Sequence, residues 1–144
     1  MENRDLEREI VAQPRAFVRR KDMTAVRTIA GNERYELSVH LMEAEEAELD
    51  LLEVILEGST HEGEHVYATA EASITGDHHV ITRAYTRALL LVKATGSRVL
   101  ALVVGDEEPQ QQLVAFAQQD KVTLSRRRRA GAFLHAPLAS FTPT

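Results

Sequence analysis

Residues 61–65 read HEGEH and fit the HExxH pattern, which makes them the first candidate for chemistry in this sequence. On a helix this spacing places two histidines on one face as zinc ligands, with the glutamate beside a metal-bound water. The context favours a loop, because residues 58–60 are Gly-Ser-Thr, Gly63 lies inside the motif and a strand pattern follows at once. We therefore expect a solvated loop, with a metal-dependent hydrolase built on His61-Glu62-x-x-His65 as an alternative.

Four histidines are candidate metal ligands if the loops that carry them meet: His61, His65, His78 and His79. The last two begin a predicted helix, where the helix dipole keeps a histidine neutral and able to bind a metal. Exposed first-turn side chains are the simpler interpretation, so we predict no cofactor and keep zinc as an alternative. The sequence has no cysteine, which excludes disulfides, cysteine-bound zinc, iron–sulfur clusters and thiol nucleophiles.

Basic side chains form the second candidate site. Two basic segments, 15–27 and 126–129, would bind phosphates if they lay on one surface, and the chain would then be a nucleic-acid-binding protein. The candidate residues for this site are Arg19, Arg20, Lys21, Arg126, Arg127, Arg128 and Arg129. Arginine runs also pair with acidic surfaces, so an acidic protein, or the acidic part of this chain, is the other candidate partner.

Charge is strongly segregated along the chain. Residues 1–31 carry a net +2, residues 32–77 a net −12 and residues 78–144 a net +5, which together give the net charge of −5. An acidic middle repels a phosphate backbone within a Debye length of about 8–10 Å, so only the two ends could face nucleic acid. The same pattern favours self-association of an acidic face with a basic one.

The first half of the chain combines one clear helix with ambiguous segments. Residues 5–13 have helical spacing, and a basic, irregular arm follows them. Apolar residues then alternate with polar ones, which predicts a strand over 35–43. Residues 43–57 fit either a helix or a strand, and we favour a strand over 49–57.

The second half is clearer. Residues 66–74 alternate and predict a strand, with alanines on its inner face that leave room for a close neighbour. The helix predicted over 79–94 is that neighbour. Its Arg83 and Arg87 are expected as solvated charges or, with Arg98, as an anion site.

A strand over 98–105, a helix over 106–119 and a strand over 121–124 follow, in the order of a parallel crossover. The tail over 125–144 contains phenylalanine and leucine after its arginines, so we expect it to pack on the body or on a partner.

These elements predict a single α+β domain: a small antiparallel sheet of three strands covered by a long helix, with a C-terminal strand–helix–strand extension. Its parts are an N-terminal helix and basic arm (1–34), the sheet and helix core (35–96), the extension (97–124) and the arginine-rich, apolar tail (125–144).

Composition narrows the function. The chain has 144 residues, 44% hydrophobic and 27% charged, and no stretch reaches 18 consecutive apolar residues, so no membrane span is expected. The charged N-terminus does not resemble a secretory signal, which predicts a cytoplasmic location. Aromatic residues, at 5%, are too few for a base-stacking platform. We expect a non-enzymatic binding, assembly or regulatory domain that forms homo-oligomers.

Overall fold

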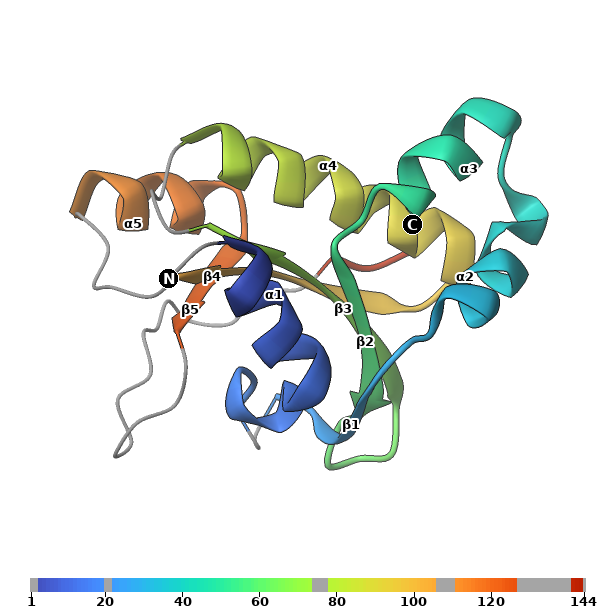
Figure 1. Cartoon of the computed structure of the whole chain (residues 1–144), viewed down its shortest axis with the longest axis horizontal. Coiled ribbons are helices and arrows are strands. Elements are labelled where there is room, and N and C mark those ends of the chain that lie inside the picture. The colour runs from blue at the N-terminus through green and yellow to red at the C-terminus, as the bar shows by residue number, and fades with distance from the viewer. Residues whose placement is uncertain (1–2, 20–21, 74–77, 106–110, 127–140, 144) are drawn as a thin grey trace.

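Five strands form one mixed sheet in the order β1-β2-β3-β4-β5 (Figure 1). The computed structural model describes residues 3–19, 22–73, 78–105, 111–126 and 141–143. The first three strands are antiparallel, whereas β4 is parallel to β3 and β5 is parallel to β4. The strands are β1 (Thr24–Thr28), β2 (Val54–Ser59), β3 (His65–Ala72), β4 (Arg98–Gly105) and β5 (Val122–Arg126).

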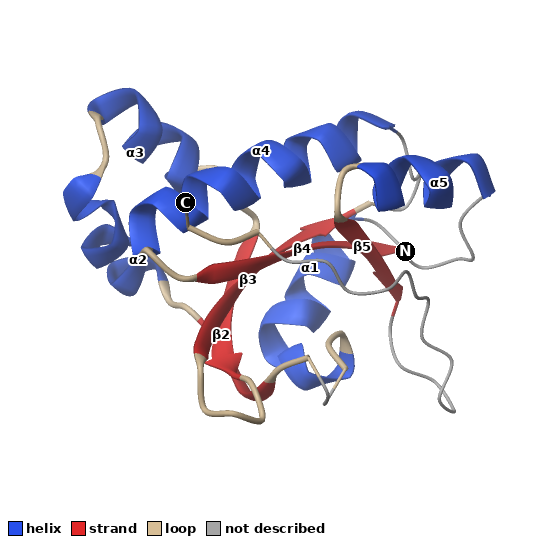
Figure 2. Ribbon diagram, turned by 180° about the vertical axis from the view of Figure 1, so that it is seen from behind, coloured by secondary structure: helices blue, strands red, loops and turns tan. Residues whose placement is uncertain are grey.

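Helices cover both faces of this sheet (Figures 1 and 2). The long helix α4 and the shorter α5 lie on one face, α1 lies on the other, and α2 and α3 stand beside the C-terminal half of α4. The helices are α1 (Asn3–Ala12), α2 (Gly31–Leu37), α3 (Glu43–Asp50), α4 (His78–Thr95) and α5 (Gln111–Gln119), with the 3₁₀ turns η1 (Pro14–Ala16) and η2 (Ser38–His40). None of the described helices is both long and apolar enough to cross a membrane.

The strand β3 is buried on both faces, and each face packs against a different helix. Ala68, Ala70 and Ala72 belong to the core layer that contains Leu6 and Ile10 of α1. The other face carries Tyr67, Thr69 and Glu71 and lies under α4. The expectation that the long helix packs on the alanine face is therefore wrong. Alternation separates the two faces of a central strand but does not say which helix covers which face.

The predicted strand over 35–43 is also wrong, because this segment forms α2 and η2. The alternating residues contain two pairs at helical spacing. Leu37 and Leu41 pack toward the core, whereas Tyr35 and Val39 are exposed. A period of two always includes i, i+4 pairs, so the alternation fits a short helix as well as a strand.

The ambiguity over 43–57 reflects two successive elements. The helix α3 ends at Asp50, and β2 begins four residues later at Val54. The third antiparallel strand comes instead from the basic arm: β1 pairs with β2 through a register shift between Thr24 and Arg27. Ala25, inside this shift, has a φ of 52°, which identifies a bulge that no apolar pattern signals.

The remaining elements are confirmed. The helix over residues 5–13, the strand over 66–74, the long helix and the parallel β4–α5–β5 unit all form. The first five residues of the predicted helix over 106–119 lie outside the described residues, as do 127–140 of the tail. Phe141 is buried and pairs with Val99 through two backbone hydrogen bonds of 2.8 Å, so this part of the tail does pack on the body.

The close approach of α1 to β3 gives the first prediction. Replacing Ala70 with Leu inserts volume between strand and helix, and we expect a loss of about 1–3 kcal/mol in the free energy of unfolding. The matched control is Ala44→Leu on the exposed surface of α3, which should change stability by less than about 0.5 kcal/mol. Urea denaturation measures both. Equal effects of the two substitutions would show that α1 does not pack tightly on the alanines.

Candidate functional site

The register of β2 and β3 brings two glutamates opposite one another. Val54 pairs with Ala70, so Glu53, one residue before β2, stands across from Glu71. Glu71 is 1% exposed, and the Glu53 side chain is 21% exposed. Like charges directly opposite on neighbouring strands repel each other, and burial strengthens the repulsion. Two ionised carboxylates here therefore need cations or a shared proton.

Two arginines of α4 supply the cations. The Arg87 guanidinium donates from Nη1 to Glu71 Oε1 at 2.5 Å and from Nε to Glu48 Oε1 of α3 at 3.2 Å. Arg83, one helical turn earlier, lies 3.5 Å from both Glu53 Oε2 and Glu71 Oε1. The expectation of a solvated arginine is wrong for Arg87, which is buried. The Arg83 side chain is 44% exposed, and both arginines hold carboxylates of the same chain.

The surroundings also shift the pKa of Glu53. Burial raises the pKa of Glu53 to about 7, and its hydrogen bond to Glu71 and the negative charge of Glu71 add to this rise. The backbone N–H of Ala72 donates to Glu53 Oε1 at 3.2 Å and opposes the rise. Glu71 Oε2 is buried and accepts no hydrogen bond from a described donor, so the protonated carboxyl of Glu53 is the group that can donate to it.

Charged groups from the neighbouring helices surround this cluster. Arg34 of α2 donates to the carbonyl oxygens of Leu52 at 2.5 Å and of Glu53 at 3.1 Å, and burial lowers the pKa of Arg34. The negative charge of Glu7, on α1, contributes to the raised pKa of Glu53. We call Glu48, Glu53, Glu71, Arg83 and Arg87 the carboxyl–arginine cluster. It connects β2 and β3 directly to α3 and α4.

The carboxylates of the cluster contact arginines of the same chain and leave little room for a substrate. A carboxyl group that keeps its proton near neutral pH can act as a general acid when a substrate reaches it. Here Glu71 is almost fully buried, and Arg87 and Arg83 lie against the carboxylates from the α4 side. The cluster therefore positions helices, and in particular it holds α3 through the bond from Arg87 to Glu48.

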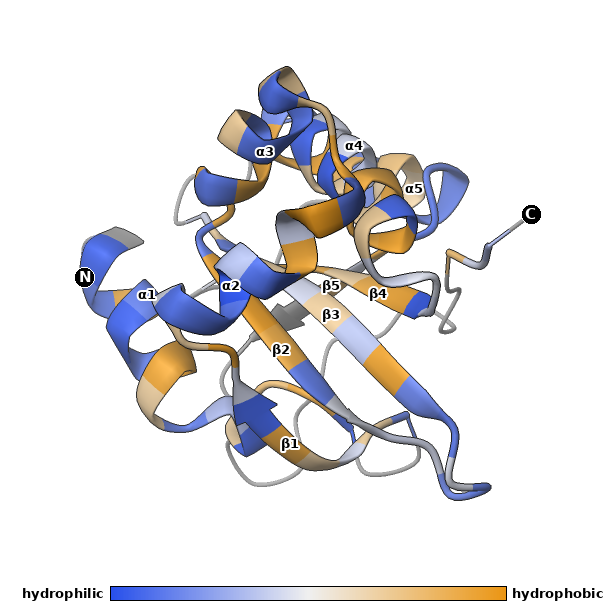
Figure 3. Cartoon of the chain, turned by 90° about the vertical axis from the view of Figure 1, so that its right-hand side faces the viewer, coloured by the Kyte–Doolittle hydropathy of each residue, from blue (hydrophilic) through white to orange (hydrophobic). Residues whose placement is uncertain are grey.

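The helices that the cluster holds expose an unusual surface. Tyr35, Val39, Met42 and Leu51 are 72%, 70%, 71% and 62% exposed, although they lie on α2, on η2 and at the two ends of α3. Arg34 and Leu52, bonded to one another, adjoin Tyr35 and Leu51 in the sequence and bring the two ends of this surface together. Figure 3 looks at this end of the molecule.

Acidic side chains lie between these apolar ones. Four of them form no salt bridge with a residue that the structure describes: Glu36, Glu43, Glu46 and Asp50. Glu45 and Glu48 point toward the body instead, where they bind Lys93 at 2.7 Å and Arg87. We call the surface of Tyr35, Val39, Met42, Leu51 and the four unpaired acids the α2–α3 face.

The histidines predicted as metal ligands lie at two separate places. His61 is in the turn between β2 and β3, and His65 begins β3, where it bonds to Glu57 at 2.9 Å. His78 and His79 begin α4, which follows the other end of β3, and His78 stacks on Phe116. Among the residues that the structure describes, no three histidine or acidic side chains are grouped to hold a metal ion.

The HExxH segment is a hairpin turn, as its glycine suggested. The backbone N–H of Thr60 donates to the carbonyl of Glu64, and Gly63 has a φ of 85°. Without a helix, the two histidines do not project from one helical face with Glu62 between them.

Most of the predicted basic site falls outside what the structure describes. Arg20, Lys21 and Arg127 to Arg129 are outside the described residues, and Arg126 ends β5 without a described side chain. Arg19 pairs with Asp22 at 2.7 Å. The other predicted partner of Arg83, Arg98, binds Glu64 beside the hairpin turn.

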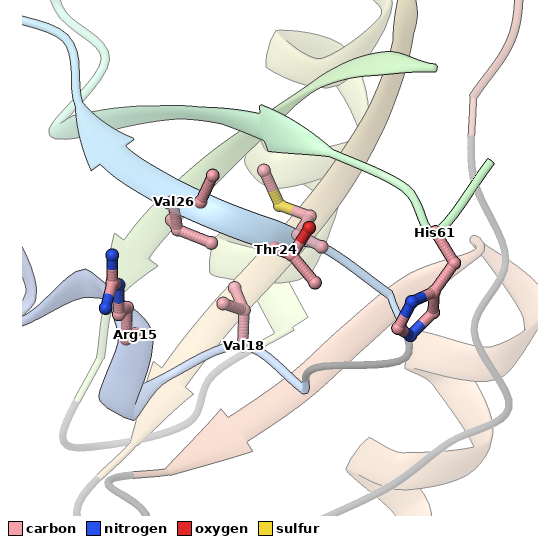
Figure 4. A pocket seen from close by; sticks show the side chains of 7 residues that line it. Arg15, Val18, Thr24, Val26 and His61 are labelled. Atoms are coloured by element: carbon pink, nitrogen blue, oxygen red, sulfur yellow. The ribbon is translucent and has the colours of Figure 1, made fainter. Parts of the chain in front are cut away.

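A pocket of about 540 Å³ lies beside β1, with Arg15 at one end and His61 at the other (Figure 4). Its wall is apolar, from Val18, Met23 and Val26. Its polar side chains are exposed or half-buried, so none of them is fixed to orient a ligand. The pocket shares no residue with the cluster or the α2–α3 face.

Sequence reasoning missed the cluster for a physical reason. Glu53 and Glu71 are eighteen positions apart, and only the register of β2 and β3 makes them neighbours. One signal was present: an acidic residue within the alternating, alanine-rich segment 66–74 and two arginines one turn apart on the next helix.

The comparisons with known proteins do not add to this picture. No protein-family model matches the sequence, and no curated protein and no solved structure is significantly similar to it. The assignment of function therefore depends on the geometry.

The raised pKa of Glu53 makes stability depend on pH. Because the pKa of Glu53 is about 7 in the folded chain and 4.5 without its surroundings, the folded chain keeps a proton that the unfolded chain releases. This stabilisation is complete below about pH 4.5 and is lost as the pH rises through 7. Glu53→Gln donates to Glu71 at every pH, so above pH 8 it should be more stable than the wild type by about 2–3 kcal/mol.

Thermal and urea denaturation between pH 5 and pH 9 measure this difference. The control Glu36→Gln removes an exposed acid of α2 and should follow the pH dependence of the wild type. If Glu53→Gln and the wild type lose the same stability over this range, Glu53 does not hold the proton.

The ion pair of Glu71 and Arg87 gives a second test. Arg87→Met leaves a buried carboxylate with only Arg83 nearby, and we expect a loss of about 3 kcal/mol. In the double variant with Glu71→Gln, the uncompensated charge is gone. The double variant should therefore lose less stability than the sum of the losses of the two single variants, by at least about 1 kcal/mol. A double-mutant cycle from urea denaturation measures this coupling, and additive effects would contradict the pairing.

Proposed function

We propose that this chain is a non-enzymatic assembly domain whose α2–α3 face binds a basic, apolar segment of a protein. The observation that carries the proposal is the exposure of four large apolar side chains, Tyr35, Val39, Met42 and Leu51, on α2, on η2 and at the two ends of α3. Single exposed apolar residues are ordinary, but a group of large ones on neighbouring elements is typical of an interaction site.

The charge of the face selects the partner. Glu36, Glu43, Glu46 and Asp50 form no salt bridge with a described residue, although the charge of Asp50 acts on Arg34, and α3 contains no basic residue. Arginine or lysine on a partner would supply the missing charges, while leucine or phenylalanine would cover the apolar side chains. The same acids would repel nucleic acid or an acidic protein from this face.

The fold presents this face on a fixed support. Arg34 bonds α2 to the carbonyl oxygens just before β2, and Glu45 and Glu48 bond α3 to α4. Leu37, Leu41 and Leu49 pack into the core from beneath. The core beneath α2 and α3 is therefore already filled by other side chains, and the exposed apolar side chains are not needed to complete it. A preorganised surface of this kind loses little conformational freedom when a partner binds.

A labelled synthetic peptide with leucine and arginine at helical spacing tests the proposal. The double variant Val39→Ser, Met42→Ser removes two of the exposed apolar side chains. Serine suits position 42, because Met42 precedes α3 as its N-cap residue, so the variant should fold. We expect binding, measured by fluorescence anisotropy, to weaken at least tenfold, about 1.4 kcal/mol.

The matched control is Leu89→Ser, which removes an exposed leucine from α4, outside the face. It should bind the peptide like the wild type, and a peptide with glutamate in place of arginine should not bind. Equal binding to the Val39→Ser, Met42→Ser variant and the wild type would overturn the proposal. Hydrogen exchange provides an independent readout, with protection expected over residues 31–52.

A further inference from the structure

We propose that Met42 is a modification site for hydrogen peroxide, and that oxidation of its thioether to the sulfoxide releases the partner from the α2–α3 face. This inference rests on the proposed function and adds the regulation of that face. The partner would cover Met42 together with the other exposed apolar side chains, which are Tyr35, Val39 and Leu51. Of these four side chains, only Met42 contains an atom that peroxide oxidises readily.

The sulfur of Met42 is open to an oxidant, whereas that of the other described methionine is not. Susceptibility to oxidation follows exposure, and Met42 is 71% exposed. Met23 is 1% exposed and belongs to the core layer that contains Leu6 and Phe17. The third methionine, Met1, lies outside the described residues. The sequence contains no cysteine, so no thiol of the chain competes for the oxidant.

The acids near Met42 do not keep this oxidant away. Glu43 follows Met42 directly, and Glu46 lies one turn farther along α3. Hydrogen peroxide is uncharged, so negative side chains do not repel it as they repel an anionic oxidant.

The reaction is a transfer of one oxygen atom. A lone pair of Met42 Sδ forms a bond to one oxygen of hydrogen peroxide, and the O–O bond breaks. The hydroxide that leaves takes up the proton of the transferred oxygen and becomes water. The sulfur loses two electrons and the peroxide gains them, so the step needs no further reactant.

The modification changes the face and leaves the fold intact. A sulfoxide is polar, so an apolar side chain of the partner no longer covers this position favourably. Among the described residues, neither core layer includes Met42. Its backbone N–H donates to Glu45 Oε1 at 3.0 Å, and its carbonyl accepts from the N–H of Glu46 at 2.8 Å. These bonds do not involve the sulfur, and side chains with an acceptor oxygen are favoured at an N-cap.

Treatment of the purified chain with hydrogen peroxide, ended by catalase, tests the inference. Peptide mass spectrometry should show that Met42 gains oxygen at least about tenfold faster than Met23. Fluorescence anisotropy with the labelled leucine–arginine peptide should then show binding that is about tenfold weaker. Methionine sulfoxide reductases should restore the binding. Thermal denaturation should give the same curve before and after treatment, because the core is unchanged.

Three variants separate oxidation of Met42 from other effects of peroxide. Met42→Leu keeps an apolar side chain of similar volume, so it should bind the peptide like the untreated wild type, both before and after treatment. Met42→Gln introduces a polar side chain of similar length and should bind about tenfold more weakly without any oxidant. The matched control Met23→Leu should lose binding on treatment as the wild type does.

The outcomes separate this inference from the proposed function. An untreated wild type that does not bind the peptide would overturn both. Unchanged binding after oxidation of Met42 would overturn the inference and leave the function in place. The inference would also be wrong if Met42 and Met23 were oxidised at the same rate, or if treated Met42→Leu lost binding as the wild type does.

Discussion

A carboxylate in the middle of the sheet has to be neutralised where it stands, and the arrangement of the helices depends on this constraint. Glu71 lies on the third of five strands and is almost completely buried. An isolated charge in such a position is unfavourable by several kcal/mol, and removing one partner from a buried pair leaves that penalty uncompensated. Arg87 meets the need at 2.5 Å from α4, and its second bond to Glu48 brings in α3. The ion pair thus fixes the positions of α3 and α4 relative to the sheet.

The same constraint explains how a short helix without much core of its own is held in place. Within α3 only Leu49 is buried, and α2 has no buried residue at all. Their attachment comes from bonds of Glu48, Glu45 and Arg34 to the body, together with partly buried leucines beneath them. Because charges on the inner side do the anchoring, the outer side is free to carry Tyr35, Val39 and Met42. Contacts in the protein interior hold this surface in place, but the interior does not need these exposed side chains for its own packing.

The sequence predicted the elements whose patterns are long and regular, and it failed where tertiary contacts decide. The strand over 66–74, the long helix and the parallel unit after it have continuous periodicity, so local pattern was sufficient. The segment from Tyr35 to Leu41 is too short to distinguish a period of two from paired i, i+4 positions, and β1 depends on a bulge at Ala25. The carboxyl–arginine cluster could not be predicted from the sequence, because only the register of the strands brings its members together. The α2–α3 face was hidden by the wrong strand, although the acidity of its segment was visible.

The strong acidity of residues 32–77 divides into two parts with different roles. Glu53 and Glu71 lie against Arg83 and Arg87 of α4, while Glu45, Glu48 and Glu57 each have a described cation. The other acids of α2 and α3, Glu36, Glu43, Glu46 and Asp50, form no salt bridge with a described residue. The cations of α4 are already committed to the inner carboxylates, so the body cannot neutralise the outer ones. Complementary charge for that face has to come from a partner.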